Sequence, residues 1–172
     1  MTTIIITVLG DDKAGLVDQL SGAIAEHHGN WVRSHMAELA GKFAGVVEAT
    51  VPDTEADSLI SRLDRIENAG VLHITAHRAE PPSEPSSGRR LELHLVGQDH
   101  PGIVHQVAHV LAQHHISIDQ LETEVTPAPQ GGHLFRADAL LDLPAGFDVE
   151  LLEHDLEAIA QDLMIDLDLA DS

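Results

Sequence analysis

The chain has 172 residues, of which 43% are hydrophobic and 22% charged, as expected for a globular protein with a buried core. Nine lysines and arginines oppose 29 aspartates and glutamates, and a formal charge of −20 argues against direct binding of nucleic acid phosphates. The absence of cysteine excludes disulfides and thiolate metal sites, and no apolar run has membrane-spanning length, so we expect a cytoplasmic protein without a membrane anchor.

The sequence contains an internal repeat. Residues 10–20 return as residues 97–107, and residues 43–52 return as residues 135–144. The spacing between the copies grows along the chain, which places an insertion at 127–132, where proline and glycine indicate a turn between strands. We therefore predict two modules, residues 1–79 and 91–172, joined by a linker at residues 80–90 that contains three prolines and no apolar periodicity.

Each module shows the same order of elements. In the first copy, the patterns predict a strand at 3–9 ended by Gly10, an amphipathic helix after it, and two strands at 30–39 and 43–51 joined through Gly41. A second helix follows, and the copy closes with a short strand. The second copy repeats this order, with strands at 91–96 (ended by Gly97), 117–126, 134–143 and 165–169.

Strand, helix, strand, strand, helix, strand is the ferredoxin-like βαββαβ order of the α+β class. Each module should form a four-stranded antiparallel sheet with two helices on one face. The other face would be left uncovered, so we expect a second module or chain to cover it, and we predict a homodimer.

The Asp-His-Pro-Gly-Ile turn of residues 99–103 lies between a strand and an amphipathic helix. In this context it resembles the turn of the ACT domain, a regulatory module that commonly senses amino acids. The tandem arrangement resembles the family of glycine cleavage system transcriptional repressors and related standalone double-ACT proteins. The resemblance implies a regulatory protein and not an enzyme.

The resemblance also implies which residues hold a ligand. An acidic residue of the turn would meet the ammonium group, the helix N–H groups would meet the carboxylate, and a polar residue at the start of the second strand would complete the site. These positions are Asp12, Gly15 and Asn30 in the first copy, and Asp99, His100, Pro101, Gly102, Ile103 and Ser117 in the second. The first turn lacks the proline, so the two sites differ.

A simpler interpretation of the two aspartates stays open. Asp12 and Asp99 each precede a helix, where an aspartate side chain often accepts hydrogen bonds from the first backbone N–H groups. Such capping is compatible with ligand binding.

Several of the 13 histidines have suggestive positions. His105 and His109 have the i, i+4 spacing of two metal ligands, but they lie opposite the apolar stripe of their helix, so we interpret them as surface residues and predict no metal or cofactor. The pairs 27–28 and 114–115 fall at helix ends and are either solvated caps or a pH-sensitive interface. Trp31 is predicted to be a half-buried anchor between modules, with ligand stacking as the alternative.

No nucleotide-binding loop, nucleophile elbow or metalloprotease helix occurs in the sequence, so no catalytic residue is predicted. The leading hypothesis is a regulatory protein that binds an amino acid such as glycine and controls a protein partner, for example a transcription regulator. The alternative is a regulatory or interaction subunit of a metabolic enzyme without a small ligand of its own. An enzyme with an unrecognised site is the third hypothesis.

Overall fold

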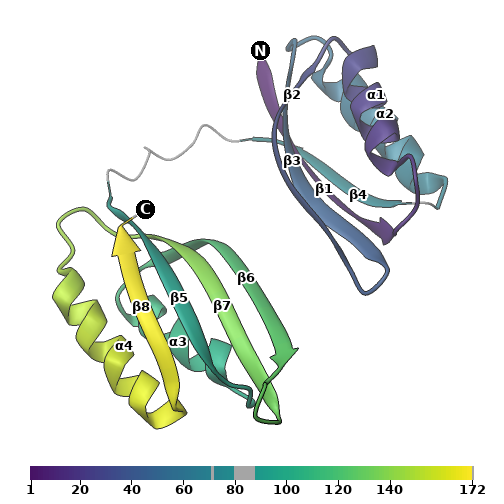
Figure 1. Ribbon diagram of the computed structural model, residues 1–172. Helices are drawn as coiled ribbons and strands as arrows, with labels where there is room; N and C mark the ends of the chain where they lie inside the picture. Colours follow the sequence, from purple (N-terminus) through teal and green to yellow (C-terminus); the bar gives the residue numbers. More distant parts are fainter. Residues whose placement is uncertain (71, 80–87, 172) are drawn as a thin grey trace. The chain divides into compact units, whose positions relative to one another are not determined.

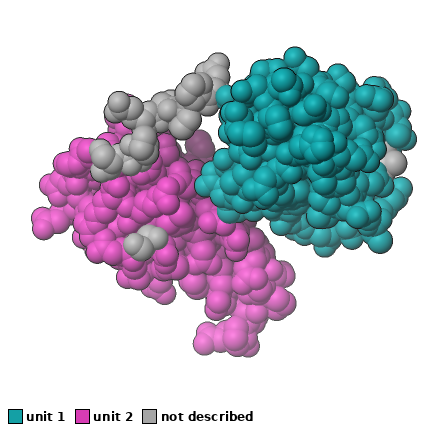
Figure 2. Space-filling view, turned by 90° about the horizontal axis from the view of Figure 1, so that it is seen from above, with its two compact units in different colours: residues 1–83 teal, residues 84–172 magenta. Residues whose placement is uncertain are grey.

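A computed structural model describes residues 1–70, 72–79 and 88–171 (Figure 1). The chain divides into two compact units, residues 1–83 (unit 1) and residues 84–172 (unit 2), which Figure 2 shows in different colours. Residues 80–87 of the expected linker lie outside the described residues, and Arg90 is the first residue of a strand.

Unit 1 has the predicted βαββαβ order. Its elements are β1 (Thr2–Asp11), α1 (Leu16–Glu26), β2 (Asn30–Leu39), β3 (Lys42–Val51), α2 (Ala56–Asn68) and β4 (Leu72–Arg78). The four strands form an antiparallel sheet in the order β2-β3-β1-β4, so that β1 lies between β3 and the last strand.

Unit 2 repeats this architecture. Its elements are β5 (Arg90–Gln98), α3 (Ile103–Gln113), β6 (Ser117–Pro127), β7 (His133–Asp142), α4 (Val149–Leu163) and β8 (Ile165–Asp171). The sheet order β6-β7-β5-β8 is equivalent to that of unit 1. The fold class and the repeat predicted from the sequence are confirmed.

The two helices of each unit lie on one face of its sheet because the strands alternate (Figure 1). In β1, Ile4, Ile6 and Val8 are buried, whereas Thr7 and Leu9, which alternate with them, are exposed. The buried side chains pack with the apolar stripe of α1, which includes Leu20. Each unit therefore has an aliphatic core of its own between helices and sheet.

The open face of the unit 2 sheet is charged. Glu92, His94, Glu122, Asp138 and Asp168 occupy the strand positions that alternate with the buried ones. Carboxylates are readily solvated, so this charged face can stay exposed to water, and the cover expected from the sequence stays a prediction.

His94 lies among carboxylates on this face. Its Nδ1 lies 2.6 Å from an Asp138 carboxylate oxygen, and this hydrogen bond, with further attraction to Glu92 and Asp168, raises the pKa of His94. A pKa raised on folding stabilises the protein at pH values below the ordinary histidine pKa, and this stabilisation is lost as the pH rises through the raised value.

We expect the ring proton signals of His94 to titrate above the ordinary histidine range in an NMR pH series. Asp138→Asn should shift the midpoint down, since it removes the main hydrogen-bond partner. Asp166→Asn removes an equal charge from the same face, away from that hydrogen bond, and should shift the midpoint less. Equal shifts in the two variants would show that general surface charge sets this pKa.

The glycines at the ends of the first strands do not end them. Gly10 pairs with Phe43 and Leu72, and Gly97 pairs with Phe135 and Ile165, so both strands continue for one more residue. At Gly97 the reason is close approach: an added Cβ would lie 2.3 Å from Cγ2 of Ile165. The prediction that these glycines terminate the strands was wrong.

The insertion in the second copy is a turn, as predicted. Residues 128–132 connect β6 to β7, and the Ala128 amide donates to the Gly132 carbonyl oxygen across the turn at 3.0 Å. Gly131 and Gly132 both have positive φ, the conformation for which glycine is suited.

Within the described ranges, no helix combines the length and the apolar character that crossing a membrane requires.

Candidate functional site

Both candidate turns place a glycine in the left-handed conformation directly before a helix. Gly15 (φ 93°) is the N-cap of α1, and Gly102 (φ 101°) is the N-cap of α3. Their carbonyl oxygens accept the first helical hydrogen bonds, from the amides of Gln19 and Gln106, each at 3.0 Å. The amides that precede these in the helix have no intrahelical acceptor, so each turn presents N–H donors.

The aspartates of the turns do not cap the helices. Neither N-cap makes a side-chain hydrogen bond, and within the described part of the chain the carboxylates of Asp12 and Asp99 have no hydrogen-bond partner. The left-handed glycine between aspartate and helix separates the two, so the capping interpretation was wrong. Both carboxylates are exposed and available to a cation.

Backbone hydrogen bonds fix both turns against the neighbouring hairpin. The Asp12 amide donates to the Gly41 carbonyl oxygen at 3.0 Å, and the Asp99 amide donates to the His133 carbonyl oxygen at 2.9 Å. The two copies thus hold their turns in the same way, next to the end of β2 in unit 1 and the end of β6 in unit 2.

His100 ties the second turn to the end of α4. Its Nε2 lies 3.2 Å from the Leu163 carbonyl oxygen, and its Nδ1 lies 3.2 Å from the Pro101 carbonyl oxygen. Both carbonyl oxygens are hydrogen-bond acceptors. A neutral imidazole ring has a single N–H group, so it can donate to one of them at a time. The first copy has Lys13 at this position. His100 is therefore placed to hold the turn, and Pro101 beside it is exposed.

Asn30 and Ser117 lie at the opposite end of the sheet from the turns. Asn30 pairs with Thr50, whereas the turn lies beyond Asp11, which pairs with Lys42. The length of β2 separates the two positions by roughly 30 Å. The structure therefore brings residues 99–103 together, but within one unit it does not bring Asn30 to Asp12 or Ser117 to Asp99.

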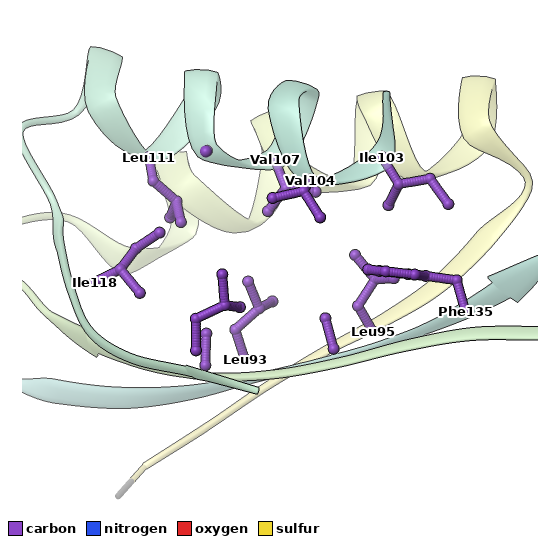
Figure 3. A pocket seen from close by; sticks show the side chains of 12 residues that line it. Leu93, Leu95, Ile103, Val104, Val107, Leu111, Ile118 and Phe135 are labelled. Carbon is purple, nitrogen blue, oxygen red and sulfur yellow. The ribbon is translucent and has the colours of Figure 1, made fainter. Parts of the chain in front are cut away.

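An apolar groove lies between α3 and the sheet of unit 2, next to the second turn. Figure 3 shows side chains of α3 that point toward those of the strands, with Ile118 at one end. Its volume is about 50 Å³. The lining side chains are all hydrocarbon: Leu93, Leu95, Ile103, Val104, Val107, Ala108, Leu111, Ile118, Leu121, Phe135, Ala137 and Ala139.

Of the predicted site residues, Ile103 alone lines this groove, where its side chain is buried. Sequence reasoning missed the other lining residues. A signal was present, because Ile118, Leu121 and Val125 are exposed aliphatic residues on an edge strand that is otherwise polar. Single exposed aliphatic residues are common, whereas three on one strand indicate a surface with a partner or ligand.

The histidine pairs end the first helices by a shared backbone motif. His28 and His115 both have φ 56°, and the residues after them donate to carbonyl oxygens five positions earlier, Ile24 and Leu111. This is the Schellman arrangement, with histidine where glycine is usual.

The first histidine of each pair joins the two helices of its unit. His27 contacts the Ser58 hydroxyl at 3.1 Å, and His114 contacts the Asp155 carboxylate at 2.8 Å. Both pairs are thus more than solvated helix ends.

The positions of His105, His109 and Trp31 can be compared directly with the predictions made for them. His105 and His109 are exposed, with ring centroids 6.2 Å apart. In the described ranges no cluster of three or more potential ligands is placed to hold a metal ion. Trp31 is half-buried and packs against the core of its own unit.

Comparisons with known proteins agree with this geometry. A family model of the ACT domain matches residues 2–75, almost all of the described part of unit 1. The crystal structure of an unknown protein from Galdieria sulphuraria is 30% identical, with 99% of this chain and 98% of that chain covered and a TM-score of 0.87. The chain belongs to the ACT-domain proteins. Its second ACT unit repeats the fold and the turn of the first.

A second solved structure covers both ACT units. It is described as a candidate glycine cleavage system transcriptional repressor, and the alignment covers 98% of this chain and 96% of that chain, with a TM-score of 0.67. Its identity of 17% shows a common tandem ACT fold and no more. A search of curated proteins found no match.

Proposed function

We propose that this tandem ACT protein is a cytoplasmic regulator that binds a free amino acid at its glycine turns and acts through a protein partner. The observation that carries the proposal is the shared turn geometry, in which an exposed aspartate carboxylate precedes a helix whose first amides lack intrahelical acceptors. An α-amino acid has the matching charges, since its ammonium suits Asp12 or Asp99 and its carboxylate suits the helix amides.

A second copy of the chain would complete each site. The turn of unit 1 is fixed to the hairpin at the end of β2, and Asn30 begins the same strand. β2 is a sheet edge, and antiparallel pairing with β2 of a second copy would bring Asn30 of one copy to the turn of the other. The same geometry holds for Ser117 on the edge strand β6. This supports the predicted homodimer.

The partner proposed is a transcription regulator, in line with the structure described as a candidate glycine cleavage repressor. The net charge of −20 disfavours direct contact with DNA and so supports action through another protein. An enzyme partner remains the second candidate, and a ligand-dependent change in binding to one purified partner class distinguishes the two.

The test is a thermal-shift and calorimetric screen of the full chain against glycine and the other standard amino acids. A ligand at 100 times its Kd should stabilise the folded protein by about 2.7 kcal/mol. Asp12→Asn and Asp99→Asn identify the unit that binds. If no amino acid raises the melting temperature or releases heat, the proposal fails.

Gly102→Ala should weaken the binding of that amino acid if unit 2 carries the site. Alanine at φ 101° is strained, so we expect a loss of about 1–2 kcal/mol in the free energy of unfolding, together with a displaced turn. Gly146→Ala is the matched control, because Gly146 has φ 75° in the loop before α4. Calorimetry should show a larger Kd for Gly102→Ala alone, and equal Kd values would contradict the assignment.

A further inference from the structure

The contact between His100 and Leu163 connects the turn of unit 2 to a rigid part of that unit. The His100 ring is half-buried, and its Nε2 lies 3.2 Å from the carbonyl oxygen of Leu163, the last residue of α4. The Leu163 side chain is 6% exposed and belongs to the core of unit 2. The oxygen atom that His100 contacts therefore has a fixed position.

The end of α4 passes almost directly into β8 (Figure 1). Helix α4 ends at Leu163 and β8 begins at Ile165, so Met164 is the single residue between them. Met164 has φ 53°, a left-handed conformation that is strained for a residue other than glycine. We call residues 163–165 the α4–β8 junction. Because it has one connecting residue, it has little freedom to absorb a displacement of Leu163.

The strand side of the α4–β8 junction is fixed next to the same turn. Gly97 pairs with Ile165, and a Cβ at Gly97 would lie 2.3 Å from Cγ2 of Ile165. Gln98, the last residue of β5, follows Gly97 and leads into Asp99 of the turn. The turn and the junction are therefore connected at two points, by this close packing and by the His100 contact. Chains of packed side chains and hydrogen bonds carry energetic coupling between parts of a protein.

Unit 1 differs at both places. Lys13 occupies the position of His100, and its side chain is exposed. Helix α2 ends at Asn68 and β4 begins at Leu72, so the connection between them is longer than in unit 2. A hollow of about 330 Å³ lies here, between the end of β1 and this connection. The space that is closed in unit 2 is thus open in unit 1.

The His100 ring also lies against the peptide group that a ligand at the turn would contact. Its Nδ1 is 3.2 Å from the Pro101 carbonyl oxygen. This carbonyl group and the Gly102 N–H group belong to one planar trans peptide and point in opposite directions. A ligand carboxylate that draws the Gly102 amide toward itself therefore turns the Pro101 carbonyl oxygen relative to the ring. The ring is held at its other nitrogen by Leu163, so the movement is passed to the end of α4.

We propose that His100 is a positioning residue of the unit 2 site and that it makes the α4–β8 junction respond to a ligand bound at the turn. The proposal rests on the proposed function and adds how one of the two sites is read out. Because Met164 is 79% exposed, the response reaches the surface, where a partner protein can meet it. The turn of unit 1, with Lys13, has no equivalent response at its α2–β4 connection.

Amide hydrogen exchange of the full chain without ligand tests the connection. His100→Gln keeps an N–H donor near the position of Nε2, toward Leu163, whereas His100→Asn keeps one near the position of Nδ1, toward Pro101. The Met164 amide donates to the Gln161 carbonyl oxygen at 3.3 Å. Its exchange should be about two- to tenfold faster in His100→Asn, the factor that corresponds to one hydrogen bond. His100→Gln should keep the parent rate.

The turns of the two units provide a second signal and its control. The Asp99 amide donates to the His133 carbonyl oxygen at 2.9 Å and should also exchange faster in His100→Asn. The Asp12 amide, which donates to the Gly41 carbonyl oxygen at 3.0 Å, is the equivalent amide of unit 1 and should keep its rate. Unchanged Met164 exchange in His100→Asn, or equal acceleration in His100→Gln, overturns the connection whether or not a ligand is found.

Two-dimensional NMR of the full chain tests the response to a ligand. Glycine, and each other standard amino acid that stabilises the chain in the thermal-shift screen, is added to the parent protein and to the variants. The amide signals of Met164 and Ile165 should shift in the parent and in His100→Gln, and should stay in place in His100→Asn. Lys13→Gln is the matched variant in unit 1 and should behave as the parent.

The outcomes separate this proposal from the proposed function. Amino acid binding that leaves the Met164 and Ile165 signals in place overturns the proposal and leaves the proposed function intact. Shifts that persist in His100→Asn also overturn it, because they reach the α4–β8 junction by another route. A chain that binds no amino acid contradicts the proposed function and the response alike.

Discussion

Leu63→Ala should lower the free energy of unfolding of unit 1 by about 2–5 kcal/mol, the usual loss for a fully buried leucine. Leu63 is 0% exposed on the inner face of α2, and its truncation leaves a cavity in an aliphatic core. Among the residues that the structure describes, no polar side chain is buried there to rearrange. The midpoint of urea unfolding, followed by the fluorescence of Trp31, measures the effect, because this single tryptophan packs against the same core.

Leu39→Ala is the control for this prediction. Leu39 is 79% exposed at the end of β2, so its truncation should change the free energy of unfolding by less than about 0.5 kcal/mol. Similar losses in the two variants would show that the helix α2 does not cover the sheet as described.

Gly97→Ala should destabilise unit 2 by about 1–3 kcal/mol, the range found for overpacked cores. The added Cβ would lie 2.3 Å from Cγ2 and 2.9 Å from Cα of Ile165. The second of these atoms is backbone, so relief requires β8 to move away from β5. Far-UV circular dichroism during thermal unfolding measures the loss.

Gly22→Ala should have the opposite effect on stability. Gly22 lies inside α1, and nothing is found within 4 Å of an added Cβ, so alanine should stabilise the helix by roughly 0.5–1 kcal/mol. If Gly97→Ala unfolds at the same temperature as the parent protein, the close approach of β5 and β8 is refuted.

The architecture was predictable because it depends on patterns that the sequence repeats. The apolar alternation of β1 and the helical spacing of Leu16, Leu20 and Ile24 each occur a second time, so the two copies support one another. The strand ends were not predictable, since a glycine is equally suited to a turn and to a close contact. Gly97 lies at a close contact, because Ile165, a residue far along the chain, packs against it.

The site was predicted only in part because local register decides it. A β-bulge follows Trp31 in β2 and Ile118 in β6, and it changes which side chains face the helices. Simple alternation from Ile118 would place Gln120 over the core, whereas the bulge places Leu121 there instead. The groove beneath α3 depends on this shift.

The placement of each first strand also determines when a unit can fold during synthesis. β1 lies between β3 and β4, and β5 lies between β7 and β8. Each of these central strands is therefore paired on both edges only after the last strand of its own unit has been made. A growing chain on the ribosome can close the first sheet once Arg78 has emerged, before the second unit exists. The second unit keeps one edge of β5 unpaired until β8 has been translated, and an unpaired edge is the form in which a nascent chain is most open to aggregation.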